Sequence, residues 1–231
     1  MKSPRLAQDI IDGYMNVSTS NVSDALDRLA IRGAPAGLLP LFPDCRKIVG
    51  AAATMRLVPN GDPAASAETT PVIGTLRAIM EAHPGDVLVI DFGGQREINS
   101  FGGVAGATTQ HFGLAGVVTD GVSRDIDEFK ALGLPVYGKG FIQTSIRGRC
   151  AFAGYGIPVH LSGIPVRPGD LVMADENGTV VVPQERVGEV LDVAAACKAT
   201  EDGVIAAIRA GADPIEAHER VRYDAMLKPQ R

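Results

Sequence analysis

Two glycine-bearing loops carry the residue types that could do chemistry. One contains Phe101-Gly102-Gly103-Val104-Ala105, and the other is Thr119-Asp120-Gly121-Val122-Ser123-Arg124-Asp125. The Arg124 guanidinium can hold a carboxylate through two hydrogen bonds, and the Asp125 carboxylate is a hard oxygen ligand for Mg²⁺ or Mn²⁺. Glycines let backbone amides approach an anion at the start of a helix, where the helix dipole adds positive charge. The loops therefore predict a site for a small anion and a divalent cation.

Each loop also has an interpretation that involves no chemistry. Glycines can serve a tight turn or close helix packing, and Gly102-Gly103-x-x-Gly106 matches neither the dinucleotide-binding nor the Walker A motif. Ser123 can cap the following helix, while Asp125 and the acidic residues after it favour the positive end of that helix. Taken alone, the residues favour this structural interpretation.

The elements that position these loops alternate between strand and helix. Apolar runs at 87–90, 115–118 and 135–137 predict strands, and helices are predicted over about 103–112 and 124–132. This order predicts parallel strands joined by right-handed crossovers. Both loops then lie at the carboxyl edge of the sheet, where proteins of this class bind ligands.

The flanking segments complete one α/β domain over residues 1–231. Helices are predicted over 4–14, about 21–30 and 71–82, and a strand or pair of strands over 46–58. Short apolar segments split by turn residues predict antiparallel strands at 157–161, 164–167, 170–174 and 179–182. A helical period returns over 185–231, which predicts a helical C-terminal extension. The expected sheet is mixed.

Composition excludes several classes of protein. The chain has 231 residues and a net charge of −5, without a basic stripe, which argues against nucleic acid as a ligand. No apolar stretch reaches the roughly 20 residues that span a bilayer, and the first residues lack the apolar block of a signal peptide. Three widely spaced cysteines fit no disulfide framework, so we expect reduced, mostly buried thiols in a cytoplasmic protein.

Three motifs occur together in the order seen in one known family. They are the run from Phe101 to Asp125, the earlier Ser18-Thr19-Ser20-Asn21-Val22-Ser23-Asp24-Ala25-Leu26-Asp27, and the later segment from Gly169 to Pro183. Over about residues 16–185 the chain resembles the RraA-like family, which contains the 4-hydroxy-4-methyl-2-oxoglutarate/4-carboxy-4-hydroxy-2-oxoadipate aldolases. The resemblance implies a swivelling-type α/β domain, assembly as homotrimers or hexamers, and a metal-dependent pyruvate-type aldolase that often also decarboxylates oxaloacetate.

The resemblance also implies a role for each loop residue. Asp125 would hold the divalent metal, Mg²⁺ or Mn²⁺, partly through waters, and Arg124 would engage the pyruvyl group of a 2-oxo acid. Both would be catalytic, since the metal and Arg124 face the oxygen on which enolate charge grows. Backbone amides of four consecutive residues would bind the substrate carboxylate: Gly102, Gly103, Val104 and Ala105.

One position departs from the pattern of the active aldolases. These carry an acidic residue, then twenty positions, then Arg-Asp, and that count leads here to Gly103, which has no side chain. Regulator-like members of the family also carry glycine there. The second hypothesis is therefore a non-catalytic regulator that binds a ribonuclease or another protein partner.

Other residues are weaker candidates. A Schiff-base aldolase would use Lys130 or Lys139 as the nucleophile, and a methyltransferase would need a cofactor loop that the sequence lacks. His111 falls near the end of the helix that follows the first loop, where it approaches the site or packs on the surface. The remaining four are turn-forming Asp91 and Asp120, the latter also a candidate support for the site, and Arg147 and Arg149, for a subunit interface or a distal substrate carboxylate.

Overall fold

The computed structural model describes residues 5–221. The first residue of the helix expected over 4–14, and the end of the extension expected over 185–231, therefore lie outside the described residues.

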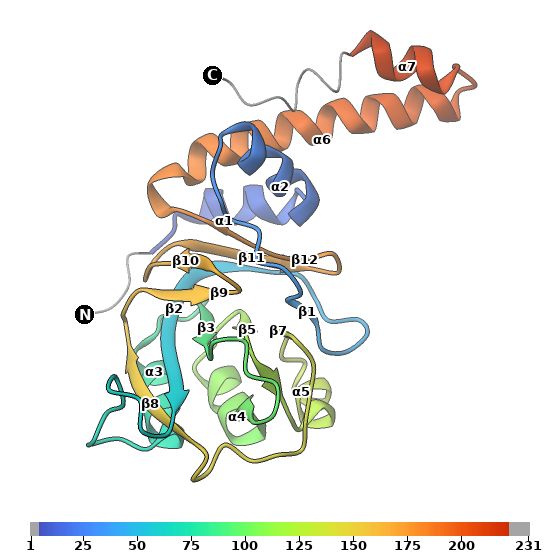
Figure 1. The fold of residues 1–231 in the computed structure, drawn as a ribbon. Helices are drawn as coiled ribbons and strands as arrows, with labels where there is room; N and C mark the ends of the chain where they lie inside the picture. Colours follow the sequence, from blue (N-terminus) through green and yellow to red (C-terminus); the bar gives the residue numbers. More distant parts are fainter. Residues whose placement is uncertain (1–4, 222–231) are drawn as a thin grey trace.

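A mixed sheet of eight strands forms the centre of the fold, in the order β1-β7-β5-β3-β2-β11-β12, with β8 also paired to β2 (Figure 1). Strands β2, β3, β5 and β7 run parallel to one another. Strands β1, β8, β11 and β12 are antiparallel to their neighbours. The bounds are β1 Leu39–Pro40, β2 Ile48–Pro59, β3 Val87–Asp91, β5 Gly116–Thr119, β7 Val136–Gly138, β8 Cys150–Tyr155, β11 Leu171–Asp175 and β12 Gly178–Val182. The predicted mixed α/β fold with parallel βαβ units is confirmed.

Two small sheets lie beside the main one. β4 (Asn99–Phe101) pairs in parallel with β6 (Val122–Ser123), and β9 (Val159–Leu161) forms an antiparallel hairpin with β10 (Ile164–Val166). The β4–β6 pair matters most for function, because each of the two glycine loops contributes one of its strands.

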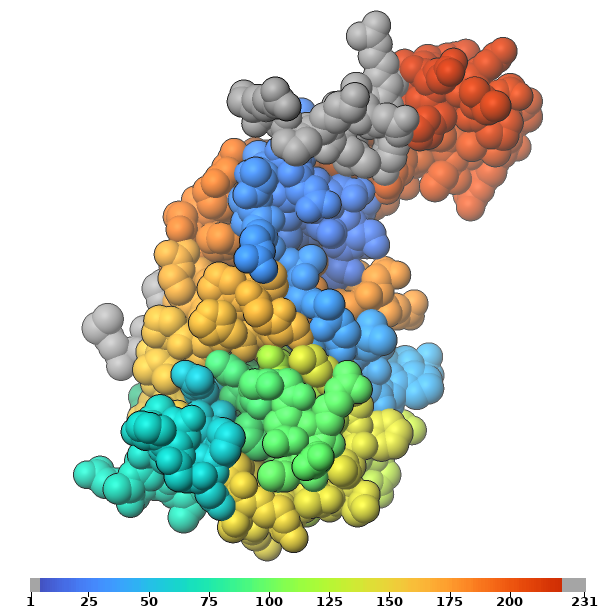
Figure 2. Space-filling view, in the orientation of Figure 1, coloured from blue at the N-terminus to red at the C-terminus, as the bar shows by residue number. Residues whose placement is uncertain are grey.

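The helices gather at two ends of the molecule (Figure 1). α3 (Pro71–Glu81), α4 (Gly103–His111) and α5 (Ile126–Leu132) lie at one end, and α1 (Gln8–Met15), α2 (Thr19–Arg28) and α6 (Val187–Arg209) at the other. After the short 3₁₀ helix Gln184–Arg186, α6 runs on past the body of the protein and carries α7 (Pro214–Arg220) near its far end (Figures 1 and 2). The predicted C-terminal helical extension is confirmed as far as residue 221. No helix within residues 5–221 combines the length and apolar character needed to cross a membrane.

Local sequence explains where the helices begin. Ser18 and Asn21 form a capping box, in which each side chain accepts a hydrogen bond from the backbone amide of the other residue at 3.1 Å. Thr70 caps α3, and Pro71 occupies its first position, where a missing amide hydrogen costs nothing. The structure starts α2 at residue 19 instead of 21 because Ser18, the first polar residue of the run, is the cap.

The core is mainly aliphatic, with a few buried aromatic rings, and packs on both faces of the sheet. Leu88 and Ile90 point to the side covered by α3, α4 and α5, whereas Val87 and Val89 point to the side covered by the β9–β10 hairpin. A third cluster joins α1, α2 and α6 to β11 and β12. The three cysteines are buried and free, as predicted: Cys45, Cys150 and Cys197.

Several elements differ from the prediction. The segment predicted as one strand or a pair is one twelve-residue strand, β2. Its first residues pair with β11, its middle with β3 and its last residues with β8. Strand β8 was not predicted, and the helix expected over 124–132 begins at Ile126. That late start has a functional consequence, because it leaves Arg124 and Asp125 outside the helix.

Candidate functional site

The two glycine loops meet at the β4–β6 pair. The backbone amide of Arg124 donates to the carbonyl of Phe101 at 3.1 Å. The rings of Phe101 and Phe129 pack 5.5 Å apart and fix α5 against the end of β4. Gly106 lets α4 approach α5, since a Cβ there would lie 2.9 Å from the Phe129 ring. The start of α4 therefore faces Arg124 and Asp125, as the sequence predicted.

Asp125 adopts a backbone conformation that turns its side chain toward α4. Its φ of 61° and ψ of 43° are left-handed, a region that costs most L-residues roughly 1–2 kcal/mol and that Asp tolerates better than most. The Oδ2 atom accepts a hydrogen bond from the Gly103 amide at 2.8 Å. The carboxylate thus spans from α5 to the first amide of α4, where it also benefits from the positive end of that helix.

The structural interpretation of this loop is wrong in one respect. Ser123 does not cap α5: the capping residue is Asp125, whose side chain makes no capping bond to that helix. The Ser123 hydroxyl is buried and has no hydrogen-bond partner within residues 5–221. The left-handed turn at Asp125 causes this difference, because it moves the helix start two residues along the chain.

Arg124 lies against the same carboxylate, and one of its donors has no acceptor among the described residues. Its Nε atom is 3.4 Å from Asp125 Oδ2, and the two side chains are 31% and 33% exposed. This contact is an ion pair and not a hydrogen bond. The Nε atom is buried, and its N–H has no hydrogen-bond acceptor among the described residues. A buried guanidinium N–H without an acceptor is costly unless another group binds it. An anionic ligand would supply that group.

Neither Gly102 nor Gly103 adopts a left-handed backbone, but a side chain at either position would crowd a neighbouring side chain. A Cβ on Gly102 would lie 2.9 Å from Asp125 Oδ2 and 3.2 Å from Arg124 Nε. A Cβ on Gly103 would overlap the carboxylate of Glu128, which the sequence indicates only as an acid that favours the start of α5 and not as a neighbour of α4. Since α5 brings Glu128 here only through its packing on α4, no local sequence signal could have revealed it.

The donor set fits a hard divalent cation. Asp125 offers oxygen ligands and is one-third exposed, so water molecules can complete a coordination shell. Within residues 5–221 no group of three or more His, Cys, Asp or Glu side chains could hold a metal alone. Magnesium requires no such group, since it is usually bound through one or two carboxylates together with waters and substrate oxygens.

Asp91 and Asp120 accept hydrogen bonds from loop amides at the carboxyl edge of the main sheet. Asp120 accepts hydrogen bonds from the backbone amides of Gly94 and, at 2.8 Å, Ser162. Asp91 accepts from the amides of Gly93 and His160, both at 3.1 Å. Burial raises the pKa of Asp120, although the amides of Gly94 and Ser162 and the charge of nearby Lys139 act in the opposite direction. The expectation that these residues form turns is confirmed for Asp91.

The remaining candidates lie outside this arrangement. His111 is at the opposite end of α4 from Gly103, where its ring contacts Phe112 edge-on at 5.3 Å. Lys139 pairs with Asp120 at 3.9 Å and is mostly buried, whereas Lys130 is exposed on α5. Arg149 donates to a backbone carbonyl of its own loop at 3.2 Å.

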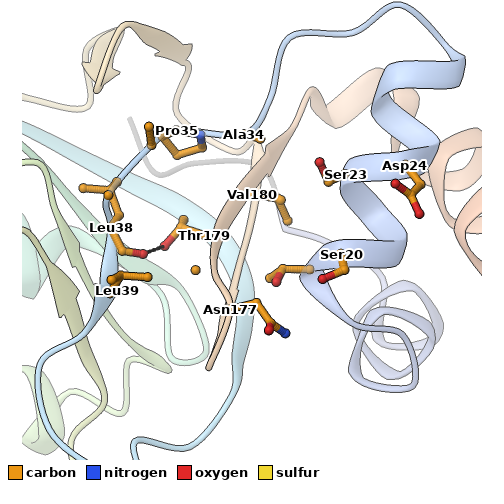
Figure 3. A pocket seen from close by; sticks show the side chains of 14 residues that line it. Ser20, Ser23, Asp24, Ala34, Pro35, Leu38, Leu39, Asn177, Thr179 and Val180 are labelled. Atoms are coloured by element: carbon orange, nitrogen blue, oxygen red, sulfur yellow. Dashed lines mark hydrogen bonds between the residues drawn. The ribbon is translucent and has the colours of Figure 1, made fainter.

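A separate cavity of about 380 Å³ opens between α2, residues 34–39 and the β11–β12 hairpin (Figure 3). Ser20, Ser23 and Asp24 line it from α2, and Thr179 donates to the Leu38 carbonyl at 3.2 Å across its floor (Figure 3). Its lining includes no residue of the two glycine loops. This cavity is thus distinct from the candidate site at the start of α4, where Asp125 accepts a hydrogen bond from Gly103.

Comparisons with known proteins give one family match and several similar proteins. The family model described as "RraA-like: Aldolase/RraA" matches residues 19–181. A protein of Halalkalibacterium halodurans named "Putative 4-hydroxy-4-methyl-2-oxoglutarate aldolase" is 32% identical over 186 residues, which cover 80% of this chain and 82% of that protein. Protein DlpA of Legionella pneumophila is 29% identical over 96% of this chain, which spans only 34% of the length of DlpA.

Solved structures share the fold. An uncharacterized protein from Pseudomonas syringae superposes with a TM-score of 0.81 at 29% identity, covering 93% of this chain and 99% of that one. Streptomyces coelicolor RraAS2 is described as an unusual member of the RNase ES inhibitor RraA protein family. It superposes with a TM-score of 0.73 at 26% identity, covering 86% of this chain and 96% of that one.

Proposed function

The chain belongs to the RraA-like family, and from this premise we propose that it is a divalent-metal-dependent lyase that releases pyruvate from 2-oxo acids. Its reactions would be aldol cleavage of substrates similar to 4-hydroxy-4-methyl-2-oxoglutarate and decarboxylation of oxaloacetate. One observation carries the proposal: the Arg124 and Asp125 side chains meet at the start of α4 beside Gly102 and Gly103, with a buried arginine N–H left without an acceptor among the described residues.

The residues present divide the work of binding the substrate. Asp125 would hold Mg²⁺ or Mn²⁺, which when bound would act as a Lewis acid on the keto oxygen. Arg124 would bind and orient the pyruvyl unit. The Gly103 amide already donates to Asp125. The substrate carboxylate would therefore bind at the next amides, Val104 and Ala105, which no preceding turn of helix can satisfy.

Bond cleavage leaves an electron pair that Arg124 would stabilise. In aldol cleavage the C4 hydroxyl gives up its proton to water and becomes the carbonyl of the leaving fragment, whereas oxaloacetate loses C4 as CO₂. In both reactions the electron pair of the broken C3–C4 bond forms the enolate of pyruvate. Protonation at C3 then gives pyruvate. Arg124 contributes to the rate because negative charge on the enolate oxygen is greatest as the bond breaks, which is when a fixed cation stabilises it most.

Pyruvate release tests the proposal directly. Oxaloacetate and 4-hydroxy-4-methyl-2-oxoglutarate are supplied in turn, with Mg²⁺ or with a chelator, and pyruvate is measured with lactate dehydrogenase. We expect metal-dependent release that Arg124→Ala lowers by roughly 10²–10³-fold. The exposed Arg209 of α6 provides a matched control, and Arg209→Ala should retain full activity.

A second candidate function is regulation of a ribonuclease. It is favoured by the absence of a side chain at Gly103 and by the structural similarity to RraAS2. A chain that releases no pyruvate under any of these conditions, yet binds a ribonuclease of the RNase ES class in a titration, would establish this function in place of the enzymatic one.

We also propose that the chain assembles as a homotrimer or hexamer, as its resemblance to the family implies. Light scattering coupled to gel filtration should give about three or six times the 24.1 kDa chain mass.

A further inference from the structure

Another cavity lies at the end of α5 that is remote from Asp125. Its volume is about 450 Å³, which is within the usual range for ligand pockets. Lys130, in the last turn of α5, lines it together with Arg46 and its neighbours in the segment that follows β1. We refer to it as the Arg46–Lys130 cavity. Its lining includes no residue of the two glycine loops, so it is separate from the candidate site.

The two basic side chains of this cavity have no acidic partner. Arg46 and Lys130 are exposed, and neither forms an ion pair or a side-chain hydrogen bond among the described residues, whereas Arg167 and Lys198 both pair with acids. The one acidic side chain in the lining is Asp44. Three other cavities within residues 5–221 are each lined by one more acidic than basic side chain. A net positive lining in a chain of net charge −5 indicates an anionic ligand.

The backbone around Arg46 is held in place before any ligand binds. Its carbonyl accepts a hydrogen bond from the Tyr137 hydroxyl at 3.0 Å, and the Leu41 amide donates to a carbonyl of β7 at 3.0 Å. Arg46 also borders a smaller cavity beside Asp175 and Glu176, but it pairs with neither acid. A ligand would therefore need to order little more than the two basic side chains, which favours binding.

Apolar groups form most of the remaining lining. Pro135 is buried, and the half-buried Phe42 ring packs against the core clusters on both faces of the main sheet. Pro43 adds a second rigid ring. A flat apolar group can pack against such surfaces, because aromatic and proline rings lose little conformational freedom on contact. The ligand should therefore carry its charge at one end of an apolar body.

The number of charges selects a monoanion. Two basic side chains and one acidic side chain leave a single positive charge, which one carboxylate balances. A phosphate dianion would leave an excess of negative charge, to which the end of α5 adds roughly half a charge.

We propose that the Arg46–Lys130 cavity binds a small monocarboxylate that carries an apolar ring. The carboxylate would lie between Arg46 and Lys130, and the ring would pack against Phe42 and the two prolines. This site is distinct from that of the proposed function, and neither inference depends on the other.

Benzoate is the probe, because it combines one carboxylate with one apolar ring. Saturation-transfer difference NMR on the full chain should give a Kd of about 1 mM, as for a weakly bound ligand of its size. Arg46→Gln and Lys130→Gln should each raise Kd about threefold to fivefold, the size expected for one exposed charge pair, and the double variant about tenfold. Arg209→Gln removes the same charge from exposed α6 and should change Kd less than about twofold.

Related compounds test the charge and the ring separately. Acetate carries the charge without the ring, and benzamide carries the ring without the charge. Each should bind at least about fivefold more weakly than benzoate. Acetate that binds as tightly as benzoate would overturn the role of the apolar lining, and benzamide that does so would overturn the role of the two cations. Inorganic phosphate that displaces benzoate at a lower concentration than acetate does would overturn the choice of a monoanion.

The candidate site can also attract a carboxylate, so its contribution is measured separately. Arg124→Ala should leave the Kd for benzoate within about twofold of the parent value. Loss of binding in Arg124→Ala, with no change in Arg46→Gln and Lys130→Gln, would place benzoate at the candidate site and overturn this inference while the proposed function stands. A parent chain that shows no saturable binding up to about 20 mM benzoate would overturn it as well.

Discussion

Replacing Asp125 with Asn separates the charge of this residue from its backbone role. Asn tolerates the left-handed conformation about as well as Asp, so the turn into α5 should persist. The Asn carbonyl can still accept the hydrogen bond that Gly103 donates to Asp125 at 2.8 Å. What disappears is the negative charge, together with its attraction to Arg124 and to a metal ion.

The structure sets the size of the effects on stability and rate. Exchanging a charged acceptor for a neutral one costs about 1 kcal/mol, and the loss of a one-third-exposed ion pair costs at most about another 1 kcal/mol. At about 2–4 °C per kcal/mol for a chain of this length, Tm should fall by roughly 2–8 °C. Turnover should fall further, by about 10²–10³-fold, which corresponds to roughly 2.7–4 kcal/mol of transition-state stabilisation.

Two measurements on the same preparation compare the loss of stability with the loss of catalytic rate in Asp125→Asn. Thermal unfolding gives the loss of stability, and metal-saturated pyruvate release gives the loss of rate. Asp127→Asn is the matched control, since it removes the same charge two residues away and should leave both nearly unchanged. Turnover of Asp125→Asn within threefold of the parent would refute the reasoning, because the charge at the start of α4 would then have no catalytic role.

Three further predictions concern Gly102, the core and the thiols. Gly102→Ala should lower kcat/KM at least about tenfold, because the added Cβ would displace the Asp125 carboxylate and Arg124 Nε. Its Tm should change by less than about 3 °C, since the displaced atoms lie at an exposed edge. A kcat/KM equal to that of the parent would contradict this prediction. Leu88→Ala should cost roughly 2–5 kcal/mol in urea unfolding, because Leu88 is fully buried. Burial raises the pKa of Cys45 and Cys197, and that of Cys150 to about 11. Iodoacetamide at pH 8 should therefore label all three thiols of the folded chain only slowly, at rates that rise as the pH increases toward the raised pKa values. Labelling should become rapid once the chain is unfolded in urea, because the thiol pKa values then return to their ordinary range.

Much of the fold could be predicted because the decisive signals are local. The apolar run Val87–Ile90 marks a strand covered on both faces, and the glycine loop followed by helical spacing marks α4. Strands of two or three residues, such as β4 and β6, have no comparable signal. They exist because the two glycine loops meet in space, and that meeting depends on the whole sheet.

The residue types of the candidate site could be found in the sequence, but its geometry could not. Arg124 and Asp125 are candidates because a cation and a carboxylate follow a strand and precede a helix, yet only the resemblance to the RraA-like family assigns them roles. The left-handed turn at Asp125 could not be inferred, since Ser123 is an equally good capping residue by sequence. The approach of Glu128 to Gly103 depends on how closely α4 and α5 pack, which Gly106 and Phe129 determine together.

Hydrogen exchange at the methyl group of pyruvate tests the central claim most directly. An enzyme that forms the enolate of pyruvate must also exchange the C3 protons of pyruvate itself, whichever 2-oxo acid it prefers. In D₂O with Mg²⁺, proton NMR should show the methyl signal decaying in the presence of the parent chain. Decay should stop when a chelator is added or when Asp125→Asn replaces the parent. A folded, Mg²⁺-saturated parent that exchanges no faster than buffer alone would contradict the account.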